Sequence, residues 1–126
     1  MTESVFLGLK PTADDVRTGL FGGVGSVSVW NLLGRQRAAP FTAVLACELS
    51  PGADVGRHVQ QRDAELLIGL EGTGLVTIAG VTKTFGAGVV HHVAFGTSLA
   101  IRNTSGTASL RYLIIKGTPP STADAK

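Results

Sequence analysis

Two stretches framed by glycines constrain this chain more than any other feature of its sequence. In the first stretch, His58 and Gln60 are two residues apart, so a strand at this position would point both side chains to one face. Glycines at the ends of both stretches suit tight turns. The spaced positions are Gly52, His58, Gln60, Glu65 and Gly72, followed by Gly88, Ala94, Gly96, Leu99 and Asn103. This frame predicts short strands separated by turns.

Composition favours a single all-β domain. The 126 residues include 17 glycines, and 44% of the residues are hydrophobic whereas 16% are charged. Short apolar runs with frequent turn signals indicate a sandwich or a barrel closed on itself. We also expect a short helical turn at residues 11–16, with Thr12 as its cap. The expected strands are residues 26–30, 41–49, 65–70, 75–79, 89–95, 99–102 and 110–116.

The chain divides into an N-terminal arm at residues 1–25, a barrel at 26–117 and a loose tail at 118–126. Its basic residues are scattered and the net charge is +2, so we expect no nucleic-acid partner. No apolar run approaches the ~20 residues that span a bilayer, so we expect no membrane partner. Because Cys47 is the only cysteine and cannot form an internal disulfide, a cytoplasmic location is the simplest expectation.

Around His58 the sequence resembles a small single-domain bacterial cupin of type 2. The resemblance covers residues 41–115, and 15 residues separate the two motifs, a short spacing typical of single-domain members. It implies a double-stranded β-helix, the cupin jelly roll. The matching residues are Pro51, Gly52, His58, Glu65, Leu70, Glu71, Gly72, Thr73, Gly74, Gly80, Phe85, Gly88, Val93, Gly96 and Asn103.

The resemblance also implies a metal site, from which half of the ligands are missing here. Family members place His at positions 58, 60 and 99 and Glu at position 65, and these groups converge on a divalent metal ion. This chain keeps His58 and Glu65 but has Gln60 and Leu99, and Ala94 replaces a family proline. An amide is a weaker ligand than imidazole for Zn, Fe, Mn or Ni, and leucine is no ligand. We therefore expect a degenerate metal site.

His91 is a candidate replacement ligand. Alternation along residues 89–95 predicts that His91 points inward and His92 outward. A hairpin centred near Gly96 would then set His91 opposite position 101 and one pair from Leu99. The alternative is that His91 is satisfied by a hydrogen bond inside the barrel.

Three functional interpretations stay open. The first is a protein that binds a small molecule in the barrel, in a pocket with Gln60, Leu99, Tyr112 and Cys47. The second is a metal-dependent cupin enzyme, a dioxygenase, isomerase or epimerase, with Glu65 and His58 as catalytic residues. The third is a structural or regulatory module. We expect a homodimer in each case, with the arm as a candidate contact.

Overall fold

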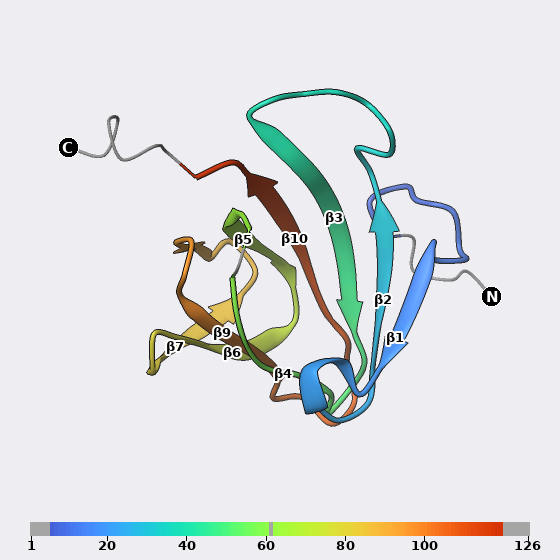
Figure 1. The fold of residues 1–126 in the computed structure, drawn as a ribbon. Coiled ribbons are helices and arrows are strands. Elements are labelled where there is room, and N and C mark those ends of the chain that lie inside the picture. Colours follow the sequence, from blue (N-terminus) through green and yellow to red (C-terminus); the bar gives the residue numbers. More distant parts are fainter. Residues whose placement is uncertain (1–5, 61, 120–126) are drawn as a thin grey trace.

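The computed structural model describes residues 6–60 and 62–119, and within them the protein folds into two antiparallel β-sheets (Figure 1). The larger sheet has the order β1-β2-β3-β10-β5-β8 and the smaller has the order β4-β9-β6-β7. The elements are β1 (Asp15–Thr18), η1 (Leu20–Gly22), β2 (Ser26–Asn31), β3 (Phe41–Leu49), β4 (Asp54–Val59), β5 (Ala64–Glu71), β6 (Thr73–Ile78), β7 (Val81–Gly86), β8 (Val90–Val93), β9 (Ser98–Asn103) and β10 (Leu110–Gly117). The all-β jelly roll expected from the sequence is confirmed.

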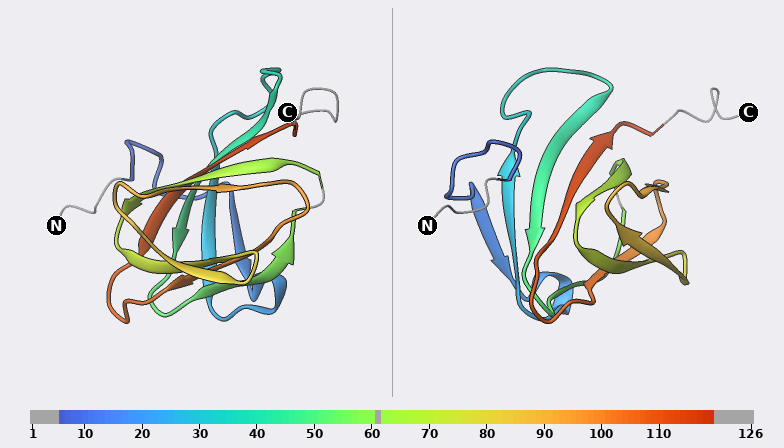
Figure 2. Two further views of the ribbon diagram at one scale, coloured as in Figure 1. Left: turned by 90° about the vertical axis from the view of Figure 1, so that its left-hand side faces the viewer. Right: turned by 180° about the vertical axis from the view of Figure 1, so that it is seen from behind.

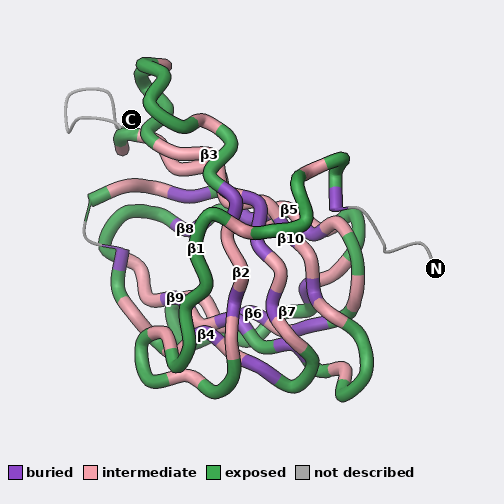
Figure 3. The backbone as a smooth tube through the Cα atoms, turned by 90° about the vertical axis from the view of Figure 1, so that its right-hand side faces the viewer, coloured by how far each residue is buried: buried purple, intermediate pink, exposed green. Residues whose placement is uncertain are grey.

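The two sheets face each other (Figure 2). In Figure 1 and in the right-hand view of Figure 2, β1, β2, β3 and β10 form one wall, and β4, β6, β7 and β9 lie opposite. Buried residues concentrate in the strands, whereas β1 and most turns are exposed (Figure 3). Long strands such as β3 form because branched and aromatic residues fit a pleated, half-buried surface.

The N-terminal region differs from the helical turn expected at residues 11–16. Asp15–Thr18 is instead strand β1, which pairs antiparallel with β2 through Asp15↔Val29 and Thr18↔Ser26. Backbone pairing to an available sheet edge overrides the weak local capping signal at Thr12. Residues 1–5 of the expected arm and 120–126 of the expected tail lie outside the described residues.

The register of β10 with its neighbours places particular side chains at one level of the interior. Lys116 pairs with Glu65 of β5, and Tyr112 pairs with Cys47 of β3. In the smaller sheet, His58 of β4 pairs with Leu99 of β9. Because side chains alternate along a strand, Lys116 and Tyr112 share the inner face of β10.

A second apolar cluster covers part of the outer face of the larger sheet. Phe6 meets Trp30 edge to face, with ring centroids 5.5 Å apart, and both pack with Ala46. The indole N–H of Trp30 donates to the Lys10 carbonyl at 2.9 Å. Residues 6–13 therefore pack against this chain's own sheet.

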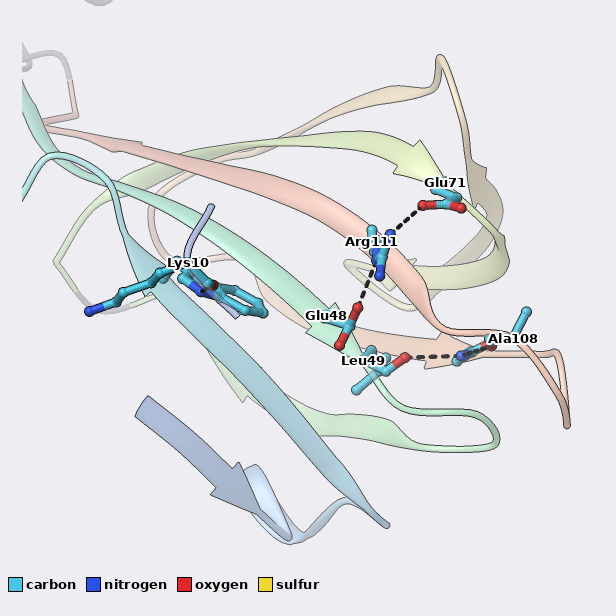
Figure 4. A network of polar contacts seen from close by, with 8 residues as sticks. Lys10, Glu48, Leu49, Glu71, Ala108 and Arg111 are labelled. Carbon is cyan, nitrogen blue, oxygen red and sulfur yellow. Dashed lines mark hydrogen bonds and ion pairs between the residues drawn. The ribbon is translucent and has the colours of Figure 1, made fainter. Parts of the chain in front are cut away.

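Arg111 anchors the same outer face. Its guanidinium lies 5.2 Å from the centre of the Phe6 ring and bonds Glu48 at 2.6 Å and Glu71 at 2.9 Å (Figure 4). These contacts join β3, β10 and β5 on the side of the sheet that faces away from the interior.

The short helix η1 is held tightly against β4. A Cβ added at Gly56 would lie 1.9 Å from the Phe21 carbonyl oxygen, and one added at Gly23 would lie 2.2 Å from the Asp54 carbonyl oxygen. Asp54 also accepts a hydrogen bond from the Val24 amide at 2.6 Å. Glycine at both positions lets the two backbones approach closely.

Among the described residues, no helix has the length and hydrophobicity that a membrane span requires.

Candidate functional site

A cavity of about 590 Å³ lies between the two sheets. Most of its lining is apolar, and its polar groups come chiefly from β4, the segment that follows β4, and the facing ends of β5 and β10. It is lined by Leu20, Phe21, Val27, Val29, Leu45, Cys47, Val55, His58, Val59, Gln60, Arg62, Asp63, Glu65, Leu99, Ile101, Tyr112, Ile114 and Lys116.

Glu65 is the most deeply buried charged side chain of the cavity. Only 4% of its surface is exposed, and its Oε2 lies 3.5 Å from the Lys116 ammonium. Its Oε1 has no hydrogen-bond partner among the described residues. Burial raises the pKa of the Glu65 carboxyl, and the positive charge of Lys116 opposes this rise only in part. The Glu65 carboxyl therefore holds its proton more tightly than an exposed glutamate does.

His58 lies on the opposite side of the cavity with one ring nitrogen committed. Its Nδ1 is 2.9 Å from the Gly56 carbonyl, which can only accept, so Nδ1 carries the proton. Nε2 then accepts a long hydrogen bond from the Gln60 amide nitrogen, 3.5 Å away. Such a neutral imidazole can accept a proton or a hydrogen bond at Nε2.

Phe21 covers the imidazole of His58. The two rings are stacked with centroids 3.9 Å apart and planes 13° apart, and 55% of Phe21 is exposed to solvent. Phe21 has the left-handed φ of +53°, which is uncommon for an aromatic residue. The close packing of η1 on β4 holds it there.

Cys47 and Tyr112 are opposite each other on the neighbouring strands β3 and β10 of the larger sheet. Both are almost fully buried and their side chains interact. Burial raises the pKa of the Cys47 thiol to about 12 and that of the Tyr112 phenol well above its ordinary value. Both groups are therefore neutral polar contacts in the cavity.

The structure brings together all but one of the side chains that the sequence singled out. His58, Gln60, Glu65, Leu99, Tyr112 and Cys47 all line the cavity. His91 does not line it. The alternation expected at this position is present, because His92 is exposed and His91 is partly buried.

The strand pairing expected for His91 is wrong. β8 pairs with β5, with His91 opposite Leu67, whereas β9 pairs with β4 and β6. The His91 Nε2 lies 2.8 Å from the Thr84 carbonyl, and its ring is 6.0 Å from that of Phe85. A jelly roll sends consecutive strands to different sheets, so a local hairpin does not form here.

Two lining residues, Phe21 and Lys116, were missed from the sequence. Lys116 could have been found, because alternation from Tyr112 through Ile114 places it inward. Phe21 had no such signal, since it lies in a glycine-rich segment with no periodicity.

One known family model matches the part of the chain that contains most of the barrel strands. The cupin domain model matches residues 45–116, more than half of the chain. The protein is a cupin. Comparison with proteins of curated function finds no match.

Solved cupin structures share this fold. A predicted oxalate decarboxylase from Thermotoga maritima is 25% identical, with a TM-score of 0.78 over 86% of this chain and 94% of the other. A cupin 2 conserved barrel protein from Salinispora arenicola is 20% identical, with a TM-score of 0.63 over 77% of each chain. The cupin domain of an XRE family transcriptional regulator from Enterobacter cloacae is 19% identical, with a TM-score of 0.65 over 75% of this cupin and 98% of the other chain.

The donors of this cupin do not fit the divalent metal that the fold family implies. No group of three or more His, Cys, Asp or Glu side chains in the described residues is close enough to hold an ion. Leu99 faces His58 with no donor atom, and Gln60 offers only a neutral amide. The Lys116 ammonium, 3.5 Å from Glu65, would repel a cation at that carboxylate. We therefore derive no chemical step through a metal.

Proposed function

We propose that this cupin binds a small organic molecule in its barrel without a resident metal ion. The observation that carries the proposal is the cavity of about 590 Å³ with the unpaired Oε1 of Glu65 in its wall. Ligand pockets are typically ~300–1,000 Å³, mostly apolar, with a few polar groups that orient the ligand. His58, Gln60 and Tyr112 supply such groups here.

A cavity-filling substitution tests this proposal. Leu99→Phe adds volume inside the cavity, whereas Ile115→Phe adds the same kind of ring on the outer face of β10. Tag-free protein is screened against a panel of small organic molecules by thermal denaturation and native mass spectrometry. We expect compounds that stabilise the unmodified protein and Ile115→Phe to have no effect on Leu99→Phe. Equal stabilisation of all three proteins would contradict binding in the barrel.

A second candidate is a metal-free isomerase or epimerase. His58 Nε2, held only by a long hydrogen bond from Gln60, and the Glu65 carboxyl with its raised pKa form a pair suited to accepting and donating a proton. A bound ligand incubated in deuterium oxide should then exchange a carbon-bound hydrogen, as measured by mass spectrometry. Glu65→Gln and His58→Gln should each abolish this exchange. A ligand that binds without exchange excludes this candidate and leaves the binding function.

We also propose that the protein is a homodimer in the reducing cytoplasm. The outer face of β5 and β8 supports the dimer, because Leu66 is 39% exposed and Val90 is 56% exposed on it. The single buried Cys47 is compatible with that compartment. Sedimentation of unmodified protein and of Leu66→Glu tests the dimer, since the charge should give a monomer. A structural or regulatory role would rest on this interface alone and would survive filling of the cavity.

A further inference from the structure

We propose that the ligand is an amphipathic organic acid whose single carboxylate is bound by Lys116 and Arg62. The apolar body of the acid extends between the sheets toward β2 and β3. This inference rests on the proposed binding function and specifies the chemical class of the ligand.

Lys116 supplies the fixed positive charge of the cavity. It is opposite Glu65 in the β10–β5 register, and its side chain is 33% exposed. An ammonium group has three donors, and the contact with Glu65 Oε2 at 3.5 Å engages only one of them. The remaining donors are available to an anionic group that enters the cavity.

Arg62 adds a second cation to the same end. It follows β4 and lines the cavity, and within residues 6–60 and 62–119 its guanidinium has no ion pair or hydrogen bond. A guanidinium presents paired N–H donors that match a carboxylate. Asp63 also lines this end, with no ion pair in the described part of the chain. A ligand carboxylate placed between Lys116 and Arg62 can therefore accept hydrogen bonds from both cations.

A cationic ligand fits these charges less well. At Glu65 it would have to displace Lys116, and at Asp63, the other carboxylate of the lining, it would lie beside Arg62. A neutral ligand would leave Arg62 without an ion pair in the described part of the chain, and Lys116 with only its contact to Glu65. Electrostatic complementarity therefore favours an anion, because like charges placed together cost free energy.

The apolar part of the lining has no partner for a second charged group of the ligand. Val27, Val29, Leu45, Ile101 and Ile114 form an apolar wall on β2, β3, β9 and β10. A second carboxylate buried against these side chains would lose its hydration without gaining a partner. An acid with a hydrocarbon tail or ring is therefore favoured over a short dicarboxylic acid.

Three ligands that share one tail test the charge preference. Octanoate, octanol and octylamine are titrated into the unmodified protein at neutral pH by calorimetry. We expect octanoate to bind at least ~10-fold more tightly than octanol, as one charge-assisted contact provides, and octylamine to bind most weakly. Binding of octanol tests the cavity itself, independently of charge.

Substitution of Lys116 tests whether its ammonium group contributes to the preference for octanoate. Lys116→Met should reduce the advantage of octanoate over octanol, because Arg62 is then the only cation left at the polar end. Lys83→Met, which removes an exposed ammonium on β7 outside the cavity, is the matched control and should keep the full preference. The ranking of the three ligands in the unmodified protein does not depend on whether Lys116→Met folds.

Each other outcome has a defined meaning. Octylamine binding as tightly as octanoate, or an undiminished octanoate preference in Lys116→Met, would overturn the assignment of the ligand as an acid. Octanol binding without any octanoate preference would overturn it too, while the binding function would stand. Failure of all three ligands to bind would overturn both.

Discussion

The ring of Phe21 is stacked on the imidazole of His58, with centroids 3.9 Å apart. This contact joins η1, outside the sheets, to β4 in the wall of the cavity. It shields one face of His58, whose Nδ1 is bonded to the Gly56 carbonyl and whose Nε2 lies 3.5 Å from the Gln60 amide nitrogen. Phe21 is therefore positioned to control access to His58.

Gly56→Ala should separate the two rings. The new Cβ would lie 1.9 Å from the Phe21 carbonyl oxygen, so η1 must move away from β4. We expect the His58 ring protons to lose the ring-current shift caused by Phe21 in the NMR spectrum, with a stability loss of roughly 1–3 kcal/mol. Gly106→Ala is the control, since a Cβ there meets nothing within 4 Å. Phe21→Ala gives the His58 shifts expected without the stack. If the ring-current shift of His58 persists in Gly56→Ala, the stack survives and the prediction is wrong.

Glu65→Gln should change how stability depends on pH. Burial raises the folded-state pKa of Glu65 above its usual value of 4.5. The protonated carboxyl therefore contributes its full stability below that value, and the contribution is lost as pH rises through the folded-state pKa. Each unit by which the pKa is raised corresponds to about 1.4 kcal/mol.

Urea denaturation between acidic and neutral pH measures this effect. The free energy of unfolding of Glu65→Gln should exceed that of the unmodified protein increasingly toward neutral pH. Glu71→Gln, which removes a carboxylate that is 61% exposed, should leave the decline in place. Parallel pH profiles for the unmodified protein and Glu65→Gln would mean that Glu65 does not cause the decline.

Restoring the missing imidazoles should restore metal binding. Leu99 is opposite His58 in the β4–β9 register, and Gln60 lies beside His58 at the cavity wall. The double substitution Gln60→His and Leu99→His would give three imidazoles and a carboxylate, a set suited to first-row transition metals. We expect Zn²⁺ affinity to rise at least ~100-fold over the unmodified protein, by competition with a chromophoric chelator. Equal affinities would refute the view that positions 60 and 99 determine metal binding.

Cys47 should be unreactive in the folded protein. Burial and the nearby Glu65 charge raise its pKa to about 12, so only about one molecule in ten thousand carries the thiolate at pH 8. Ellman's reagent should label less than a few per cent of the native protein in the time that labels the urea-unfolded protein completely. Rapid labelling of the native state would show that the cavity opens widely around Cys47.

Asn103→Asp should destabilise the fold although the side chain keeps its shape. The Asn103 amide nitrogen donates to the carbonyls of Leu49, Ser50 and Ala108 at 2.8–3.1 Å, and only 2% of the residue is exposed. A carboxylate oxygen in that place would face three acceptors and carry a buried charge. Thermal and urea denaturation should show a loss of about 3 kcal/mol or more, whereas Asn31→Asp at an exposed position should cost much less.

The sequence by itself determined the barrel and most of its cavity. Strand β3 has the bounds expected from its apolar run, and His58, Gln60, Glu65 and Leu99, the positions that the resemblance to cupins groups together, all line the cavity. Alternation along a strand and turn chemistry are local properties, so they can be predicted without knowledge of the partners of a strand.

Only the tertiary structure decided which strands meet. We expected His91 near Leu99, but β8 pairs with β5. The His91 ring forms a hydrogen bond with the Thr84 carbonyl. Lys116 faces Glu65 because β10 pairs with β5, and Phe21 reaches His58 because two glycines let η1 approach β4. Each relationship joins segments far apart in the chain, and their pairing depends on the packing of the whole domain rather than on local sequence. The pairing of Lys116 with Glu65 in the cavity could therefore be found only from the folded structure.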